Sequence, residues 1–152
     1  MNIVLNEPEI PINTGNIGRT CVAVGAALHL IRPLGFLTDD KSIKRSGLDY
    51  WHQLDVRYYD SFDDFLIENG QPWVHMATTK AVRSYADVSY GENAFIMFGK
   101  ESAGIPREIR ERYPDACMRI PMQKGQRSLN LANAVAIVLY EALRQRGFVG
   151  LA

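Results

Sequence analysis

Short apolar runs that alternate with helical patterns most constrain what this chain can fold into. Each run holds four or five residues and is bounded by glycine, proline or polar residues, which is typical of strands buried on both faces of a parallel sheet. Strands that alternate with helices predict an α/β fold, with a mostly parallel sheet flanked by helices. The expected strands are residues 2–5, 28–31, 73–77, 94–98 and 116–120.

Helices are expected between these strands. Asparagine or threonine can cap a helix over residues 13–24, and a serine begins another over residues 61–70 that ends at a glycine. A short basic helix is expected over residues 39–45. At 152 residues the chain fits a single domain that spans residues 1–152.

The last helix has the clearest pattern. Ser128 or Asn130 can cap it, and Gly147 follows its expected end at Gln145. Its apolar band is rich in alanine and valine and is wider than one face of a sheet is expected to cover. We therefore expect a second copy of the chain to cover part of this helix, in a homodimer. The band consists of Leu131, Ala134, Val135, Val138, Leu139, Ala142 and Leu143.

Composition narrows the possible surroundings and partners. Lysine plus arginine and aspartate plus glutamate both total 17, so any basic surface that binds nucleic acid must be local. Cys21 and Cys117 match no metal or CxxC spacing, which predicts no metal site and fits a reducing compartment. The N-terminus does not resemble a signal peptide, and no apolar run approaches the ~20 residues that span a bilayer. These features predict a soluble cytoplasmic protein that does not bind membranes.

Three segments place glycine and small polar residues directly after apolar runs, where an α/β sheet presents backbone groups and side chains to a ligand. They are residues 13–19, 98–106 and 119–134. The second segment is not a Walker phosphate loop, because Ala94 and Glu101 stand where that motif needs glycine and serine or threonine. It also fits an ordinary turn that leads to Pro106 at the first position of a helix.

The first segment likewise allows two interpretations. Asn13 and Arg19 lie within two helical turns, as part of a site or as a capped helix with a solvent-exposed arginine. Gly18 favours close approach of another group, because a glycine inside a helix costs about 1 kcal/mol relative to alanine.

Together, the three segments resemble the motifs of the SPOUT class of RNA methyltransferases, in the same order and over essentially the whole chain. Within that class they are similar to the SpoU-type enzymes that methylate ribose 2′-hydroxyls. Glu7-Pro8-Glu9-Ile10-Pro11 and the residues 45–50 resemble the minimal enzymes that act on the wobble cytidine or uridine of tRNA. The resemblance implies a C-terminal trefoil knot, an obligate homodimer and S-adenosylmethionine (AdoMet) bound in the knot.

The resemblance also assigns residues to the expected site. Asn13, Arg19, Glu101 and Asn130 match the family's catalytic motif residues near the reacting ribose. The residues carried over to the cofactor pocket are Ala77, Gly99, Ile120, Ser128 and Leu129. We expect Arg19 to stay charged, contact the target phosphate and stabilise the developing alkoxide, because a guanidinium is a poor proton acceptor. Glu101 is expected to orient Arg19.

Recognition of tRNA is expected to come from local basic patches. The candidates are Lys41, Lys44 and Arg45 in the expected basic helix, Lys80 with Arg83, Lys124 with Arg127, and Arg144 with Arg146. Lys124 and Arg127 are preferred because they belong to the third segment. A solvated charged surface explains the same residues. Three alternatives stay open: methylation of ribosomal RNA or of another tRNA position, an RNA-binding relative without catalysis, and an unrelated nucleotide-binding α/β protein.

Overall fold

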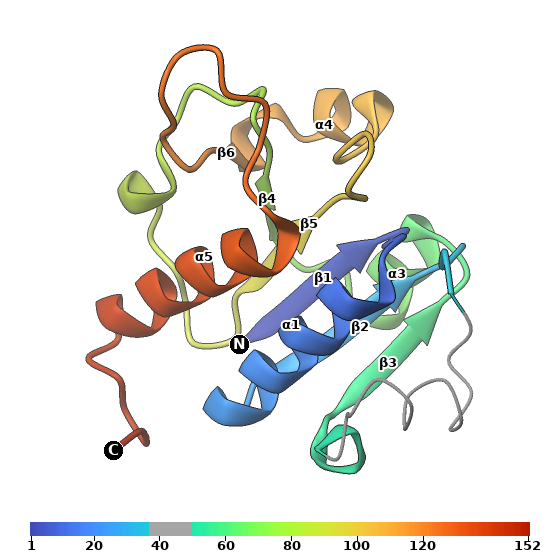
Figure 1. Cartoon of the computed structure of the whole chain (residues 1–152), viewed down its shortest axis with the longest axis vertical. Helices are drawn as coiled ribbons and strands as arrows, with labels where there is room; N and C mark the ends of the chain where they lie inside the picture. The colour runs from blue at the N-terminus through green and yellow to red at the C-terminus, as the bar shows by residue number, and fades with distance from the viewer. Residues whose placement is uncertain (37–49) are drawn as a thin grey trace.

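A computed structural model describes residues 1–36 and 50–152 of the chain. Six parallel strands form one sheet in the order β3-β2-β1-β5-β4-β6 (Figure 1). This sheet confirms the predicted α/β class. The strands are β1 (Asn2–Asn6), β2 (Ala27–Ile31), β3 (Val56–Tyr59), β4 (Val74–Ala77), β5 (Phe95–Phe98) and β6 (Cys117–Met118).

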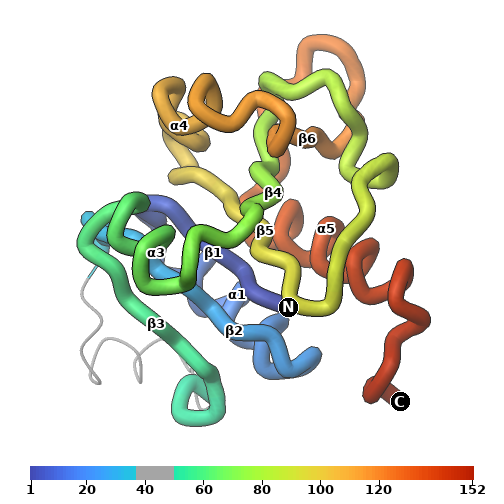
Figure 2. Tube along the Cα trace, turned by 180° about the vertical axis from the view of Figure 1, so that it is seen from behind, coloured from blue at the N-terminus to red at the C-terminus, as the bar shows by residue number. Residues whose placement is uncertain are grey.

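Helices cover both faces of the sheet and bury a separate apolar cluster on each. On one face, α1 (Pro11–Val24) and α5 (Leu131–Gln145) lie side by side (Figure 1). On the other face, seen in Figure 2, α3 (Phe62–Glu68) packs Phe65 against the sheet, and Ile109 of α4 (Arg107–Arg112) joins the same cluster. Short 3₁₀ helices lie at Trp51–Gln53, Tyr85–Asp87 and Pro114–Ala116.

Two strands differ from the prediction. Residues 56–59 were not expected to form a strand, because β3 lies at the sheet edge and its Arg57 is exposed, so no continuous apolar run marks it. β6 is shorter than residues 116–120. Ala116 belongs to a 3₁₀ helix, and Arg119 forms an isolated bridge with Ser84.

The start of α1 also differs from the prediction. The helix begins at Pro11, whose missing N–H costs nothing at this position, and Ile10 is its N-cap residue without a side-chain hydrogen bond. Asn13 and Thr14 therefore lie inside the first turn, where both are buried. By contrast, Ser61 caps α3 and Asn130 caps α5 as predicted.

Gly18 of α1 allows the close approach that the sequence indicated. A Cβ at this position would lie 3.1 Å from Leu54 Cδ2 and 3.1 Å from the Trp51 ring. A larger residue would push residues 51–54 away from the helix.

Most of the apolar band of α5 is buried within a single chain. Val135, Val138, Leu139 and Ala142 are each fully buried in the cluster shared with α1 and the sheet, whereas Leu131 and Ala134 stay half-buried. The expectation that a second copy covers part of this helix stays a prediction. The basic helix expected over residues 39–45 lies outside the described residues.

Candidate functional site

A cavity of about 620 Å³ lies at the carboxyl ends of β4 and β5. The carboxyl ends of parallel strands meet at one edge of a sheet, and ligands bind there in open α/β folds. The segments after these two strands line the cavity together with residues before and in the first turn of α5. All five residues expected in the cofactor pocket are among its lining: Ala77, Gly99, Ile120, Ser128 and Leu129.

The loop after β5 turns back on itself at the cavity wall. Gly104 N donates to Lys100 O at 2.8 Å, and Gly104 adopts a φ of 72°. A Cβ on Gly99 would lie 2.0 Å from the backbone of Gly104 and Ile105. Only glycine fits at position 99, and the close turn brings backbone groups of the loop to the cavity.

Three of the four expected catalytic residues form a continuous hydrogen-bonded chain beside the cavity. Asn130 Nδ2 donates to Asn13 Oδ1 at 3.0 Å, and Asn13 Nδ2 donates to Glu101 Oε1 at 3.0 Å. Asn130 Oδ1 accepts from the amides of Ala132 and Asn133 at the start of α5. Both ends of the Asn13 amide are thus fixed, although Asn13, Glu101 and Asn130 lie far apart in the sequence.

Glu101 also binds the two backbone amides that lead into α1. Its Oε2 accepts from Glu9 N at 2.8 Å, and its Oε1 accepts from Ile10 N at 3.2 Å. A carboxylate is stabilised at the N-terminus of a helix by free amides and by the helix dipole. The loop after β5 is therefore joined to the first turn of α1.

Arg19 lies away from this chain of hydrogen bonds. It is exposed on α1, it is not among the residues that line the cavity, and its guanidinium carbon lies 5.0 Å from the centre of the Tyr50 ring. The Tyr50 hydroxyl donates to Gly15 O and so ties this ring to α1. Within the described residues, the hydrogen bonds of Glu101 go to the start of α1 and to Asn13 rather than to Arg19.

The basic residues expected to bind RNA differ in their position relative to the cavity. Arg127 is exposed and lines the cavity, whereas Lys124 is exposed on the same segment without lining it. Lys44 and Arg45 lie outside the described residues. Two further basic residues line the cavity: Lys80, which follows β4 and is among the residues expected to contact tRNA, and Arg110, which the sequence did not indicate.

Arg110 could not have been assigned from a motif. Its Nε donates to Ile105 O at 3.1 Å, which ties α4 to the loop after β5 and brings the side chain to the cavity. Only the folded path of residues 99–110 reveals this position.

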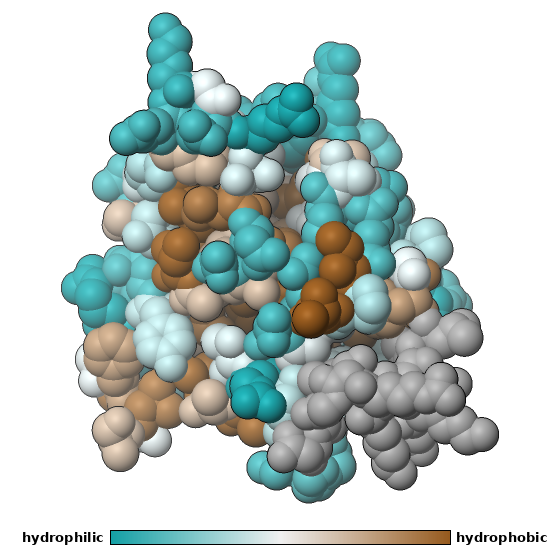
Figure 3. Space-filling view, in the orientation of Figure 1, coloured by the Kyte–Doolittle hydropathy of each residue, from teal (hydrophilic) through white to brown (hydrophobic). Residues whose placement is uncertain are grey.

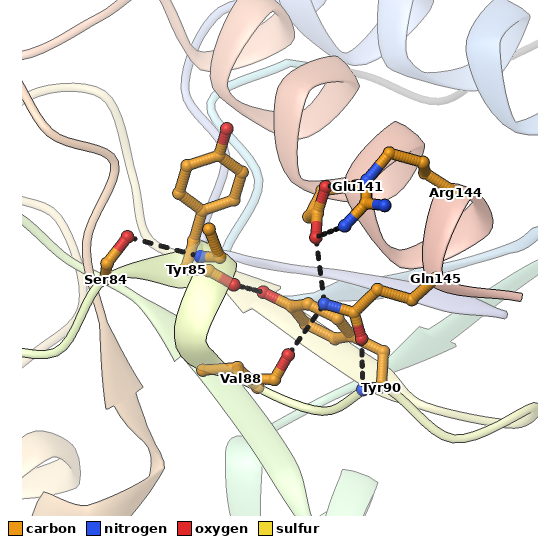
Figure 4. A network of polar contacts seen from close by, with 8 residues as sticks. Ser84, Tyr85, Val88, Tyr90, Glu141, Arg144 and Gln145 are labelled. Carbon is orange, nitrogen blue, oxygen red and sulfur yellow. Dashed lines mark hydrogen bonds and ion pairs between the residues drawn. The ribbon is translucent and has the colours of Figure 1, made fainter.

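A polar network fastens the C-terminal end of α5 to the segment between β4 and β5 (Figure 4). Gln145 Nε2 donates to Val88 O at 2.9 Å, and Gln145 Oε1 accepts from Tyr90 N at 3.1 Å. Hydrogen bonds from Arg144 and Gln145 lower the pKa of Glu141 to about 2. These contacts hold in place the helix that carries Asn130.

In residues 1–36 and 50–152, no group of three or more histidine, cysteine or acidic side chains is arranged to hold a metal ion. The helices of the same residues include none that is long and apolar enough to cross a membrane. The expectation of a metal-free site stays a prediction.

Comparison with known proteins shows similarity along the whole chain. The SpoU rRNA Methylase family matches residues 1–140. The tRNA (cytidine(34)-2′-O)-methyltransferase of Yersinia pestis is 47% identical, with 99% of this chain and 96% of that protein covered.

Solved structures agree with this similarity. A structure that concerns the 2-OH methylation of C/U34 on tRNA is 44% identical, with a TM-score of 0.89 over 97% of this chain and 96% of that one. The SpoU methyltransferase AviRb from Streptomyces viridochromogenes, in complex with the cofactor AdoMet, is 26% identical, with a TM-score of 0.82. That alignment covers 100% of this chain and 59% of AviRb.

Proposed function

The chain belongs to the SpoU rRNA Methylase family, and we propose that it transfers a methyl group from AdoMet to the ribose 2′-hydroxyl of the wobble cytidine or uridine of tRNA. The observation that carries this proposal is the 47% identity to a tRNA (cytidine(34)-2′-O)-methyltransferase, with nearly the full length of both chains covered. The solved relative concerned with C/U34 on tRNA also matches nearly end to end.

The cavity suits AdoMet in size and in the chemistry of its lining. Its volume of about 620 Å³ falls within the ~300–1,000 Å³ of typical ligand pockets. Ile120 and Leu129 offer apolar surface, and the close turn at Gly99 offers backbone donors and acceptors. Ala77 and Ser128 complete the set that would hold the cofactor. When bound, AdoMet supplies a methyl group already activated by its sulfonium.

The residues of the chain would contribute mainly alignment and charge. The fixed amide of Asn13 lies between Glu101 and Asn130, and it would orient the ribose beside the cavity. Positioning of this kind can supply several kcal/mol of the barrier reduction. Arg19 would remain charged and stabilise the ribose oxygen while its proton passes to a phosphate oxygen of the RNA or to solvent, since a guanidinium binds oxyanions well and accepts protons poorly.

We propose a homodimer on grounds other than the band of α5. The face that carries α1 and α5 exposes apolar side chains among polar ones (Figure 3). Ile12 is 67% exposed, Tyr140 is 47% exposed and Ile137 is 37% exposed. Arg19 lies two helical turns from Ile12 on the same face of α1. A second copy seated here would cover the apolar groups and bring its own Arg19 toward the cavity of the first chain.

We further propose that the single domain of residues 1–152 contains the C-terminal trefoil knot that its SPOUT resemblance implies. The contacts of Gln145 with the segment between β4 and β5 are consistent with a C-terminal helix held against that segment. We expect the dimer to act on tRNA in the cytoplasm. Arg127 and Lys80 beside the cavity, and Lys124 near it, would contact the tRNA backbone.

The decisive experiment supplies the purified protein with methyl-labelled AdoMet and bulk tRNA from cells that lack its gene. Mass spectrometry of the digested tRNA is expected to show labelled 2′-O-methylcytidine or a 2′-O-methyluridine derivative at position 34. Ribosomal RNA from the same cells serves as the competing substrate. Label in ribosomal RNA alone would replace the proposed substrate, and AdoMet binding without any transfer would indicate a silent relative.

A further inference from the structure

The side chain of Glu9 contacts the tip of the loop after β5. Its Oε2 accepts from Ser102 N at 2.8 Å, and its Oε1 accepts from Ser102 Oγ at 2.8 Å. These bonds lower the pKa of Glu9, so the group is ionised at neutral pH. In the described residues, both hydrogen bonds of Ser102 go to this one carboxylate.

The connection between the two segments is reciprocal. Glu9 N donates to Glu101 Oε2 at 2.8 Å, while the carboxylate of Glu9 accepts from Ser102. The loop after β5 therefore binds the backbone amides of Glu9 and Ile10 just before α1, and the side chain of Glu9 binds the loop in return. Lys100 Nζ, 2.9 Å from Glu7 Oε2, joins the same two segments at the base of the loop.

The loop that Glu9 binds forms a wall of the cavity. Lys100, Glu101 and Ser102 all line it, as does Asn13 from the opposite segment. The position of this wall relative to Asn13 thus depends on contacts between the two segments. At the tip of the loop, those contacts come from the side chain of Glu9.

We propose that Glu9 is a positioning residue for methyl transfer: its carboxylate holds the 100–104 loop against the start of α1 and so fixes the cofactor wall relative to Asn13. This inference rests on the proposed function. Misplacement by about 1 Å can slow a reaction roughly 100-fold, even when the changed residue does not touch the reacting atoms. Glu9 does not line the cavity, so it acts through Ser102.

The test compares Glu9→Ala with Glu9→Gln, and uses Glu68→Ala as the matched control. Alanine removes both acceptors of Ser102. Glutamine can accept from Ser102 N and donate to Ser102 Oγ, so it retains the geometry without the charge. Glu68 is exposed at the end of α3 and lies on the other face of the sheet.

We expect Glu9→Ala to lower kcat/KM for AdoMet about 10- to 100-fold, through both a lower kcat and a higher KM for AdoMet. The KM for tRNA should stay unchanged, and Glu9→Gln should retain most of the activity. Glu68→Ala should match the wild-type protein. A general loss of stability would not raise the KM for AdoMet while leaving the KM for tRNA unchanged. Thermal unfolding of each variant measures any loss of stability directly.

Two results would overturn the inference. One is wild-type kcat and KM for AdoMet in Glu9→Ala; the other is equal impairment of Glu9→Gln and Glu9→Ala. If Glu9→Ala fails to fold, Ser102→Ala provides a partial comparison, because it removes the Oγ bond and leaves the amide bond in place, so a smaller loss of kcat/KM for AdoMet is expected. Failure of the proposed function appears separately, as an absence of methyl transfer by the wild-type protein.

Discussion

At the scale of single residues, the proposed site joins three polar side chains that line the cavity and one cation, Arg19, that lies outside it. Asn13, Glu101 and Asn130 use their polar atoms on one another and on helix amides. Arg19 instead lies over the face of the Tyr50 ring. The roles proposed for them follow from their chemistry and position: the linked polar groups orient, and the charged Arg19 stabilises the reacting oxygen.

This assignment predicts that Arg19→Lys is nearly as inactive as Arg19→Ala. A lysine keeps the charge but loses the planar set of donors that binds phosphate and an oxyanion, as well as stacking on the Tyr50 ring. Single-turnover rates with labelled AdoMet measure the effect, and cofactor binding serves as the control because Arg19 does not line the cavity. Near-normal turnover of Arg19→Lys would refute the role assigned to the guanidinium.

His29 gives the fold a predictable sensitivity to acid. Its ring is fully buried, with Nδ1 2.8 Å from the Tyr59 hydroxyl and Nε2 3.2 Å from Asn2 Oδ1. Burial, aided by Arg57, lowers the pKa of His29 from 6.5 to about 4. Between these values the unfolded chain binds a proton at this site and the folded chain does not. Stability therefore falls as the pH drops from 6.5 toward 4.

The expected loss from His29 is at most about 3 kcal/mol. It is measured as the difference in unfolding free energy between pH 7 and pH 4.5, by urea denaturation. His29→Gln, which can still form hydrogen bonds with Tyr59 and Asn2, should reduce this difference. If the two proteins lose the same free energy on acidification, the titration of His29 does not contribute.

At the scale of elements, the sequence predicted features that depend on neighbouring residues better than features that depend on contacts between distant segments. Ser61 and Asn130 each cap a helix that begins at the next residue; the sequence predicted Ser61 and gave Asn130 as one of two candidates. The prediction that Asn13 or Thr14 caps α1 was wrong. The amides just before this helix donate to Glu101, which comes from another segment. Likewise, Arg110 reaches the cavity only through the folded path of its loop.

The strands show the same limit of prediction from the sequence. β1 and β2 are buried apolar runs and were recognised, whereas β3 pairs at the sheet edge with an exposed Arg57 and was missed. The cavity itself was anticipated because Gly99 and Ser128 belong to motifs that the family resemblance identified. Their distances and partners required the folded chain.

Substitutions of Asn130 separate its role as the cap of α5 from its role in the candidate site. Its Oδ1 caps α5, and its Nδ2 donates to Asn13. Asn130→Asp keeps the capping oxygen but cannot donate to Asn13, so we expect it to lose activity while it retains the contribution of the cap to stability. Asn130→Ala should lose activity and also about 1 kcal/mol of stability.

Thermal unfolding and methyl transfer, measured on both variants of Asn130, check this separation. Asn133→Ala serves as a control for substitution in the same turn, because Asn133 is exposed and contributes only its amide to the cap. An active Asn130→Asp would mean that the hydrogen bond from Asn130 to Asn13 is not needed for methyl transfer.

At the scale of the whole molecule, the proposed dimer would explain why Arg19 lies outside the cavity of its own chain. Arg19 and the exposed Ile12 share a face of α1, and the neighbouring helix α5 exposes Tyr140. A two-fold dimer through this face would be isologous, so each chain would lend its Arg19 to the other. A complete site would then need both chains.

Mixed dimers test this arrangement directly. Arg19→Ala removes the guanidinium and leaves the cavity open. Leu129→Trp keeps Arg19 and fills the cavity with a larger side chain, at a position that is 39% exposed. Each variant alone is expected to be inactive. After the two are mixed and allowed to exchange subunits, the chain with the open cavity can receive Arg19 from its partner. Random exchange should then restore about a quarter of wild-type activity.

The same mixture has a different outcome if Arg19 serves its own chain. One subunit of each mixed dimer then lacks Arg19 and the other has a blocked cavity, so no activity returns. Sedimentation of the mixture verifies that dimers form and exchange, and AdoMet binding by Arg19→Ala verifies the open cavity. Inactive mixed dimers would place Arg19 in its own chain's site, and a monomeric wild-type protein would remove the dimer from the mechanism.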